Sequence, residues 1–289
     1  MYRTKYLALI LVVAMATVAC NISVNNPLES VSIGSMETYT IDVPAPEESD
    51  EIAEVVLKFG AGQLDLNPGT DEALISGTAK YNVKEFEPKV SVDDNKIEIS
   101  QDLEDFNLLP AFSGDVENRW DLVLGMYPME LDISAGGYQG EFELGGLALH
   151  SLRFAEGAAS TKVTFSELNS VEMDTLRYDT GASSASLSGL ANANFSKMDF
   201  RSGAGEYTLD FSGELQRDAD VSIKSGLSSV TIIVLEGTPV SVEIDSGLAN
   251  IDVDGSWRVT GGRYSIPGEG PELNITVEMG AGNLELRER

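Results

Sequence analysis

One hydrophobic pattern recurs eight times along the chain, and each copy is centred on a glycine. Apolar residues lie five and three positions before each glycine, and another lies six positions after it. Alternation of this kind on both sides of a small-residue break predicts a strand, a tight turn and a second strand. The eight glycines are Gly60, Gly136, Gly157, Gly181, Gly203, Gly226, Gly247 and Gly280.

The spacing of these glycines predicts an all-β solenoid. From Gly136 the intervals are 21, 24, 22, 23 and 21 residues, followed by one of 33. A repeat of about 22 residues can hold two short strands and two turns, and we expect each coil to stack on the one before it. The alternative is a β-sandwich whose hairpins use similar turns.

The first repeat, at Gly60, is separated from the second by 76 residues. Within that interval, residues 74–83, 89–92, 96–99 and 120–124 carry less regular strand signals, and residues 101–114 predict a loop or a short helix. We therefore divide the folded part into an N-terminal β region, residues 51–130, and a repetitive solenoid, residues 131–289, that continues it.

The first twenty residues predict a secretory signal. A short basic start, Arg3 and Lys5, is followed by an apolar run that is too short to span a membrane comfortably. Cys20, the chain's one cysteine, follows small residues and resembles the lipidated cysteine of bacterial lipoproteins, although Thr17 departs from that motif. We expect a lipid on Cys20 and a tether over residues 21–50; the alternative is an ordinary cleaved signal.

Several segments resemble a known family. Phe59–Leu66, Ile75–Asn82 and Lys89–Val92 are similar to the N-terminal toast-rack domain, and the small-residue corners of residues 134–286 are similar to the β-helical toast-rack or adhesin-type repeats of bacterial envelope proteins. This resemblance implies a right-handed β-solenoid at the cell surface, without catalysis, that serves in sensing, adhesion or scaffolding.

The charge and the residue types exclude several chemistries. A formal net charge of −28 opposes binding to nucleic acid. With His150 as the chain's one histidine and Cys20 assigned to the anchor, a catalytic triad or a Cys/His zinc site is not expected, and we predict no cofactor and no metal. The abundant carboxylates leave an enzyme that acts on polysaccharides open as the alternative.

The 33-residue interval contains the candidate binding residues, which combine aromatic rings with arginines: Trp257, Arg258, Arg263 and Tyr264. Such groups suit sugar rings or anionic polymers. The alternative is a hairpin in which Trp257 covers the open end of the core.

We therefore expect a lipid-anchored, extracytoplasmic, non-enzymatic β-solenoid that acts as a surface scaffold, adhesin or envelope-sensing module. Its expected partners are the membrane, through the lipid, and a cell-wall glycan or an envelope protein. The pattern leaves the oligomeric state open.

Overall fold

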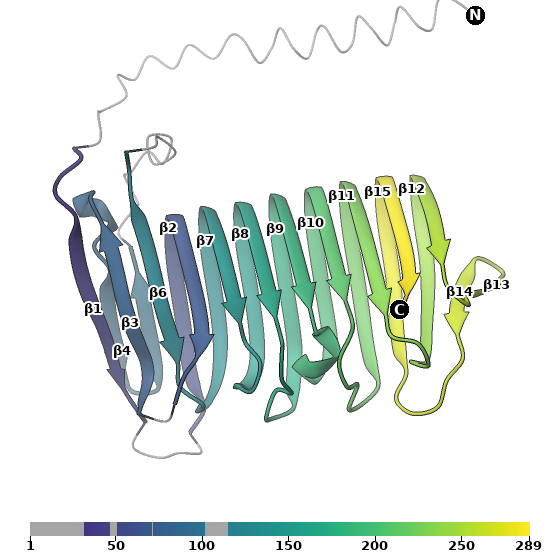
Figure 1. Ribbon diagram of the computed structural model, residues 1–289, viewed down its shortest axis with the longest axis horizontal. Coiled ribbons are helices and arrows are strands. Elements are labelled where there is room, and N and C mark those ends of the chain that lie inside the picture. Colours follow the sequence, from purple (N-terminus) through teal and green to yellow (C-terminus); the bar gives the residue numbers. More distant parts are fainter. Residues whose placement is uncertain (1–31, 47–50, 71, 102–114) are drawn as a thin grey trace, which may run out of the picture. The chain divides into compact units, whose positions relative to one another are not determined.

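The computed structural model describes residues 32–46, 51–70, 72–101 and 115–289, which belong to one compact unit. The predicted signal peptide, Cys20 and residues 102–114 lie outside the described residues. Within the unit, fifteen strands form one bent sheet that runs along the long axis (Figure 1). The alternative of a β-sandwich is therefore wrong.

The elements in chain order are β1 (Glu37–Pro44), β2 (Ala53–Pro68), β3 (Ala73–Tyr81), η1 (Lys84–Phe86), β4 (Lys89–Asp93), β5 (Lys96–Ser100), β6 (Asn118–Leu124), β7 (Pro128–Glu143), β8 (Ala148–Thr164), β9 (Met173–Ser188), η3 (Leu190–Ala193), β10 (Phe195–Asp210), β11 (Ala219–Val234), β12 (Val240–Asp254), β13 (Arg258–Thr260), β14 (Arg263–Ile266) and β15 (Leu273–Glu288).

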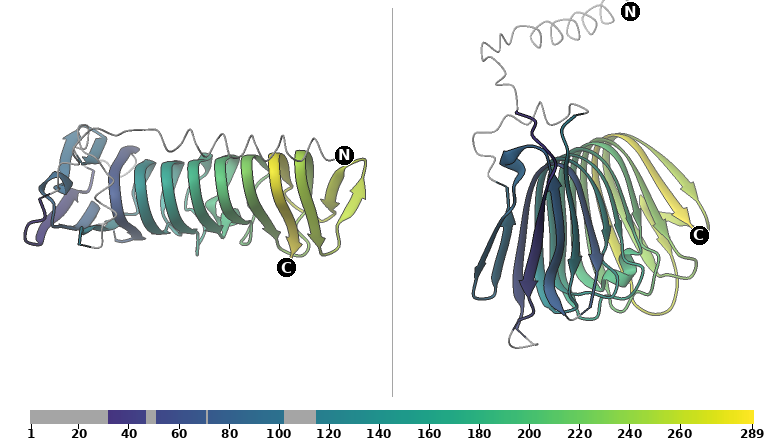
Figure 2. Two further views of the ribbon diagram at one scale, coloured as in Figure 1. Left: turned by 90° about the horizontal axis from the view of Figure 1, so that it is seen from above. Right: turned by 60° about the vertical axis from the view of Figure 1, so that its left-hand side comes forward.

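Each repeat forms one long strand that bends at its glycine, rather than two strands joined by a turn. In β9, Leu176 and Tyr178 before the bend and Leu187 after it are buried. Gly181 and Ala182 both face outward, so the alternation shifts by one position at the corner. We call the half before the glycine the first arm and the half after it the second arm. The buried side chains of both arms form the core, which lies between the arms. Figure 2 shows the stacked, bent strands from above and obliquely.

The glycines form a column along the corners because neighbouring backbones approach closely there. A Cβ atom on Gly181 would lie 2.6 Å from the carbonyl oxygen of Gly157, and one on Gly203 would lie 2.5 Å from that of Gly181. Any side chain would therefore push adjacent coils apart.

Aromatic rings fill the core along much of the stack. The centroids of neighbouring rings are 5.1–6.3 Å apart, within the range of favourable ring contacts. In order, the rings are Trp120, Phe59, Tyr138, Phe142, Phe154, Tyr178, Phe200 and Tyr207. This row joins the N-terminal region to the repetitive region as one continuous core.

The N-terminal region extends the two arms with different strands. β2 pairs in parallel with β7, so the corner at Gly60 lies directly beside the corner at Gly136. Beyond β2, the second arm continues with β6, β3 and β1, and the first arm continues with β5 and β4. The strands predicted for this region are confirmed. The tether expected over residues 21–50 is corrected in part, because Glu37–Pro44 forms β1, with Ile41 and Val43 buried against the core.

The last two coils do not follow sequence order, and here the expected stacking is wrong. β15 lies between β11 and β12, and Ile275 is paired with Val221 on one side and with Val242 on the other (Figure 1). The physical reason is that β12 and β15 carry the same inward pattern, so either can fill the position beside β11. The 33-residue interval between Gly247 and Gly280 is long enough for the chain to form β13 and β14 beyond β12 and then return as β15 to the position beside β11.

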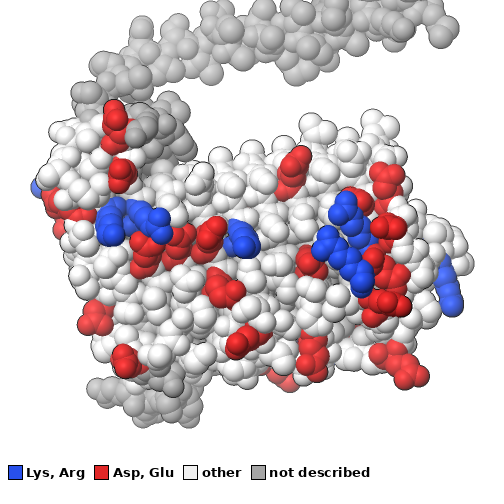
Figure 3. Space-filling view, viewed as in Figure 1, with Lys and Arg blue, Asp and Glu red and all other residues white. Residues whose placement is uncertain are grey.

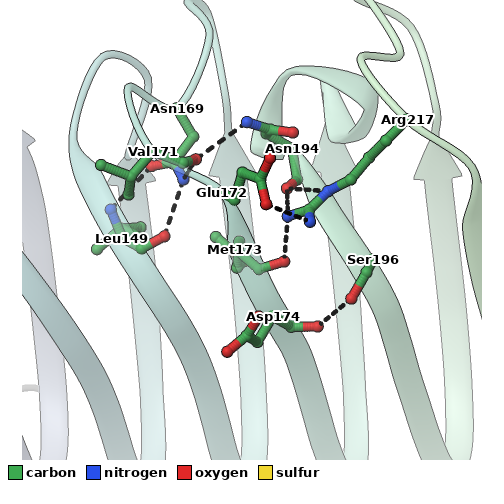
Figure 4. Close-up of polar contacts among 9 residues, drawn as sticks. All are labelled: Leu149, Asn169, Val171, Glu172, Met173, Asp174, Asn194, Ser196 and Arg217. Carbon is green, nitrogen blue, oxygen red and sulfur yellow. Dashed lines mark hydrogen bonds and ion pairs between the residues drawn. The ribbon is translucent and has the colours of Figure 1, made fainter.

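Side chains connect the loops at one rim of the stack (Figure 4). Asn169 accepts a hydrogen bond from the Leu149 amide at 2.9 Å and donates to the carbonyl oxygens of Leu149 and Val171, each at 2.8 Å. Arg217 donates to the carbonyl oxygens of Met173 and Asn194, at 2.8 and 2.6 Å. Each loop is thereby fixed to its neighbours.

Candidate functional site

The four predicted binding residues lie at the end of the stack, in or beside the hairpin β13–β14. Trp257 and Tyr264 are half-buried against the core, and the Trp257 indole Nε1 donates to the Asp254 carbonyl at 3.2 Å. Arg258 is exposed, and Arg263 is exposed and forms a 2.9 Å ion pair with Glu243. The packing of Trp257 agrees in part with the alternative interpretation, in which this ring covers the open end of the core, because Val253 on the second arm is still 42% exposed.

A second group of charged residues, which sequence reasoning missed, crosses the second arms of β6, β2, β7 and β8. Strand register places Asp121, Asp65, Glu141 and Lys162 side by side in one row, which we call the acidic row. They line a shallow groove of about 230 Å³ together with Arg119. Figure 3 shows acidic and basic side chains gathered over these strands.

Arg119 bridges two carboxylates of the acidic row. Its Nε donates to both carboxylate oxygens of Asp121 at 2.9 Å, and its Nη2 donates to Asp65 Oδ2 at 2.8 Å. Gln63 Nε2 donates to the same Asp65 oxygen at 2.9 Å. Among the described residues, the other oxygen of Asp65, Oδ1, is buried and has no hydrogen-bond partner.

These contacts give neighbouring carboxyl groups different proton affinities. Burial raises the pKa of Asp65, although Arg119 opposes the shift. The hydrogen bonds from Arg119 lower the pKa of Asp121. Two neighbouring carboxyl groups whose pKa values shift in opposite directions are a feature of acid–base sites.

The signal for part of this row is present in the sequence. Asp65, Glu141 and Lys162 each lie five positions after a repeat glycine, so aligning the repeats on their glycines places them together. The other members of this position are Ser186, Thr208, Thr231, Asp252 and Glu285. Arg119 and Asp121 lie outside the repeats, and only the pairing of β6 with β2 brings them to the row.

A further carboxylate, Glu156, faces the core at a corner rather than the surface. It accepts hydrogen bonds from the hydroxyl groups of Tyr138 and Tyr178, at 2.8 and 2.7 Å. Burial raises the pKa of Glu156 against the effect of these bonds. The hydroxyls satisfy a group that would otherwise be costly to bury, so we assign Glu156 a structural role.

Two general features of the described residues bear on the site. No group of three or more His, Cys, Asp or Glu side chains among them has the geometry to hold a metal ion. In the same part of the chain, no helix has both the length and the apolar character to cross a membrane.

Comparisons with known proteins place the chain in a family. The family model described as the N-terminal domain of toast_rack, DUF2154, matches residues 32–176 and 168–233. No curated protein matches the chain. A solved structure from Clostridium sporogenes, provisionally named a cell adhesion protein, is 18% identical, with a TM-score of 0.47, covering 88% of this chain and 100% of its own.

Two further solved structures are also similar to this chain. One from Bacteroides fragilis, provisionally named an adhesin, is 14% identical, with a TM-score of 0.45, covering 87% of this chain and 97% of its own. One from Parabacteroides distasonis, provisionally named a lipid-binding protein, is 11% identical, with a TM-score of 0.35, covering 88% of this chain and 97% of its own. Because the family model covers more than half of the sequence, this chain belongs to the toast_rack N-terminal domain family.

Proposed function

We propose that this protein is a non-enzymatic binding scaffold that a lipid on Cys20 holds outside the cytoplasmic membrane. In this proposal, the outer face of the second arms, which we call the glycan-binding face, contacts a cell-wall glycan. The observation that carries it is the alignment of one outward position across the coils, from the acidic row to the far end of the stack.

The chemistry of that face supports a polyhydroxylated, repeating ligand. Between the acidic row and the far end, the aligned position carries the hydroxyls of Ser186, Thr208 and Thr231. Adjacent strands are about 4.8 Å apart, so carboxylates and hydroxyls recur at a fixed spacing along the face. Such a row of acceptors and donors can pair with the hydroxyl groups of successive sugar units. The net charge of −28 opposes nucleic acid as the ligand.

Retention on isolated cell envelope and on purified cell-wall glycan tests the proposed face. The double variant Asp121→Asn and Glu141→Gln should bind both materials more weakly than the unchanged protein. Arg258→Gln with Arg263→Gln, which alters charge on the end hairpin, is the matched control and should bind normally. Equal retention of both variants at unchanged melting temperature would contradict this assignment, and retention on envelope but not on glycan would indicate an envelope protein instead.

The anchor is tested separately. In the native host, the protein should incorporate a labelled fatty acid and sediment with membranes, and Cys20→Ser should abolish both. An unlabelled native protein would reject the lipid anchor without bearing on the glycan-binding face.

A polysaccharide-acting enzyme is the second candidate, because Asp65 and Asp121 lie on adjacent strands and have opposite pKa shifts. The test is turnover of pectin, alginate and peptidoglycan fragments with and without calcium. Turnover that is lost in both Asp65→Asn and Asp121→Asn would establish the enzyme and reject the scaffold. We expect no turnover of these polymers.

A further inference from the structure

The second arm of β12 is an edge strand at the end of the stack. On its outer side β12 pairs with β14 over Val240–Glu243. Beyond that segment, within the described residues, no strand pairs with the outer side of residues 244–254. The position of β15 creates this edge, because β15 fills the place beside β11 and leaves β12 outermost. An unpaired row of backbone groups can pair with another extended chain.

The core is open along this edge. Val253 is 42% exposed, whereas Leu286, which lies beside it on β15, is 0% exposed. Leu248, at the corner of the same strand, is 84% exposed, and Ile251 is half-buried. An added strand with apolar residues at alternate positions would cover Val253 and Ile251 and continue the core.

The outward side chains of the edge are acidic. Asp252 and Asp254 are exposed on the second arm, and Asp245 is exposed on the first. Figure 3 shows acidic side chains over these last strands, with basic side chains beside them, and Arg287 of β15 lies next to Asp254. A complementary strand would carry Lys or Arg at the outward positions. A second copy of this chain fits poorly, because each copy has a net charge of −28 and its opposite edge strand, β1, carries Glu37 and Asp42.

We propose that this edge binds an extended segment of another protein whose residues alternate between apolar and basic, and that the segment adds to the sheet as a strand. Main-chain hydrogen bonds would supply affinity, the apolar residues would close the core, and the basic residues would face the aspartates. This site consists of the free backbone edge and the inward residues Ile251 and Val253 of β12, which take no part in the proposed glycan contact. The two surfaces share only the outward residue Asp252, so either proposal can fail without the other.

Binding of short peptides to the full-length protein tests the proposal. A fluorescent peptide of alternating Val and Lys should bind, and added salt should weaken it. The same peptide with Glu in place of Lys should not bind. Methylation of alternate backbone nitrogens should abolish binding, because it removes the donors that face the edge. Equal binding of the methylated peptide, or of the Glu peptide, would overturn strand addition.

Variants of the protein locate the site. Val253→Lys places a charge on the inward side of the edge and should weaken binding of the Val/Lys peptide about tenfold or more. Val259→Lys, at an exposed position on β13, is the matched control and should bind normally. Hydrogen exchange should show peptide-dependent protection of residues 244–254. The proposal would be overturned if the Val/Lys peptide did not bind, or if it protected other residues instead. It would also be overturned if the protein associated with itself and Val253→Lys abolished that association.

Discussion

Glu156 is a buried carboxyl group, so its ionised form is costly in the folded protein. Its pKa is raised above the ordinary value of 4.5, so the folded state holds the proton to higher pH than the unfolded state does. Stability therefore decreases as pH rises from the unfolded pKa through the folded pKa, because folding must then bury an ionised group. The tyrosine hydroxyls reduce this penalty without removing it.

Replacing Glu156 with Gln should remove this pH dependence. A neutral amide keeps one oxygen that can accept a hydrogen bond from Tyr138 or Tyr178. The variant should therefore gain melting temperature relative to the unchanged protein as pH rises from 4 to 8. Thermal unfolding of both proteins across that range is the measurement. A constant difference would show that Glu156 does not carry a raised pKa.

The corner glycines allow the backbones of neighbouring coils to approach closely. Gly181→Ala should destabilise the protein by about 1–3 kcal/mol, because the added methyl group meets a backbone carbonyl that cannot move alone. Gly34→Ala is the control, since its Cβ would meet the nearest atom, Asn82 O, at an ordinary 3.6 Å. Denaturant unfolding compares the two. Equal stability of the variants would mean that coils at the corner are not in close contact.

The loops are elements whose conformation depends on a few buried side chains. Asn169→Ala should cost about 1–3 kcal/mol, because the amide and carbonyl of Leu149 lose their side-chain partner in a buried position. Hydrogen exchange should rise around the start of β8, in residues 147–150, and in the loop of residues 165–172. Ser196→Ala, which removes one exposed hydrogen bond to Asp174, should change little. Similar exchange in the two variants would argue against the role of Asn169.

Most of the strands could be predicted from the sequence because their signals are local. In each repeat, apolar residues around a glycine determine where the strand runs, where it bends and which face it buries. β1 was missed because only a few alternating apolar residues, among them Ile41 and Val43, stand within a segment otherwise rich in Asn, Ser and Pro.

The order of β12 and β15 could not be predicted in the same way. Val242 and Ile275 occupy equivalent positions, so a local pattern does not decide which strand lies beside β11. The acidic row also could not be predicted in full from local patterns. Asp65 and Glu141 share a repeat position, but Arg119 reaches them through strand pairing, which depends on long-range packing.

At the scale of the molecule, the two ends of the stack differ. At the N-terminal end, β6, β3 and β1 extend the second arm, and at the C-terminal end that arm stops at β12. The proposed glycan-binding face lies along the second arms, and the proposed strand-binding edge lies where they stop, at β12. The protein would then contact two kinds of partner through adjoining surfaces, and the position of β15 creates the second of them.

The position of β15 between β11 and β12 creates the free edge of β12 and can be tested directly. Register pairs Ser229 with Asn283, and Asn283 with Asn250, so Ser229 and Asn250 are two strands apart. In a Cys20→Ser background, cysteines at 229 and 283 should form a disulfide on oxidation, because neighbouring strands are about 4.8 Å apart. Cysteines at 229 and 250 should stay reduced, because two strand spacings exceed the reach of a disulfide. The reverse result, a bond between 229 and 250 and none between 229 and 283, would mean that the coils follow sequence order and would contradict the account.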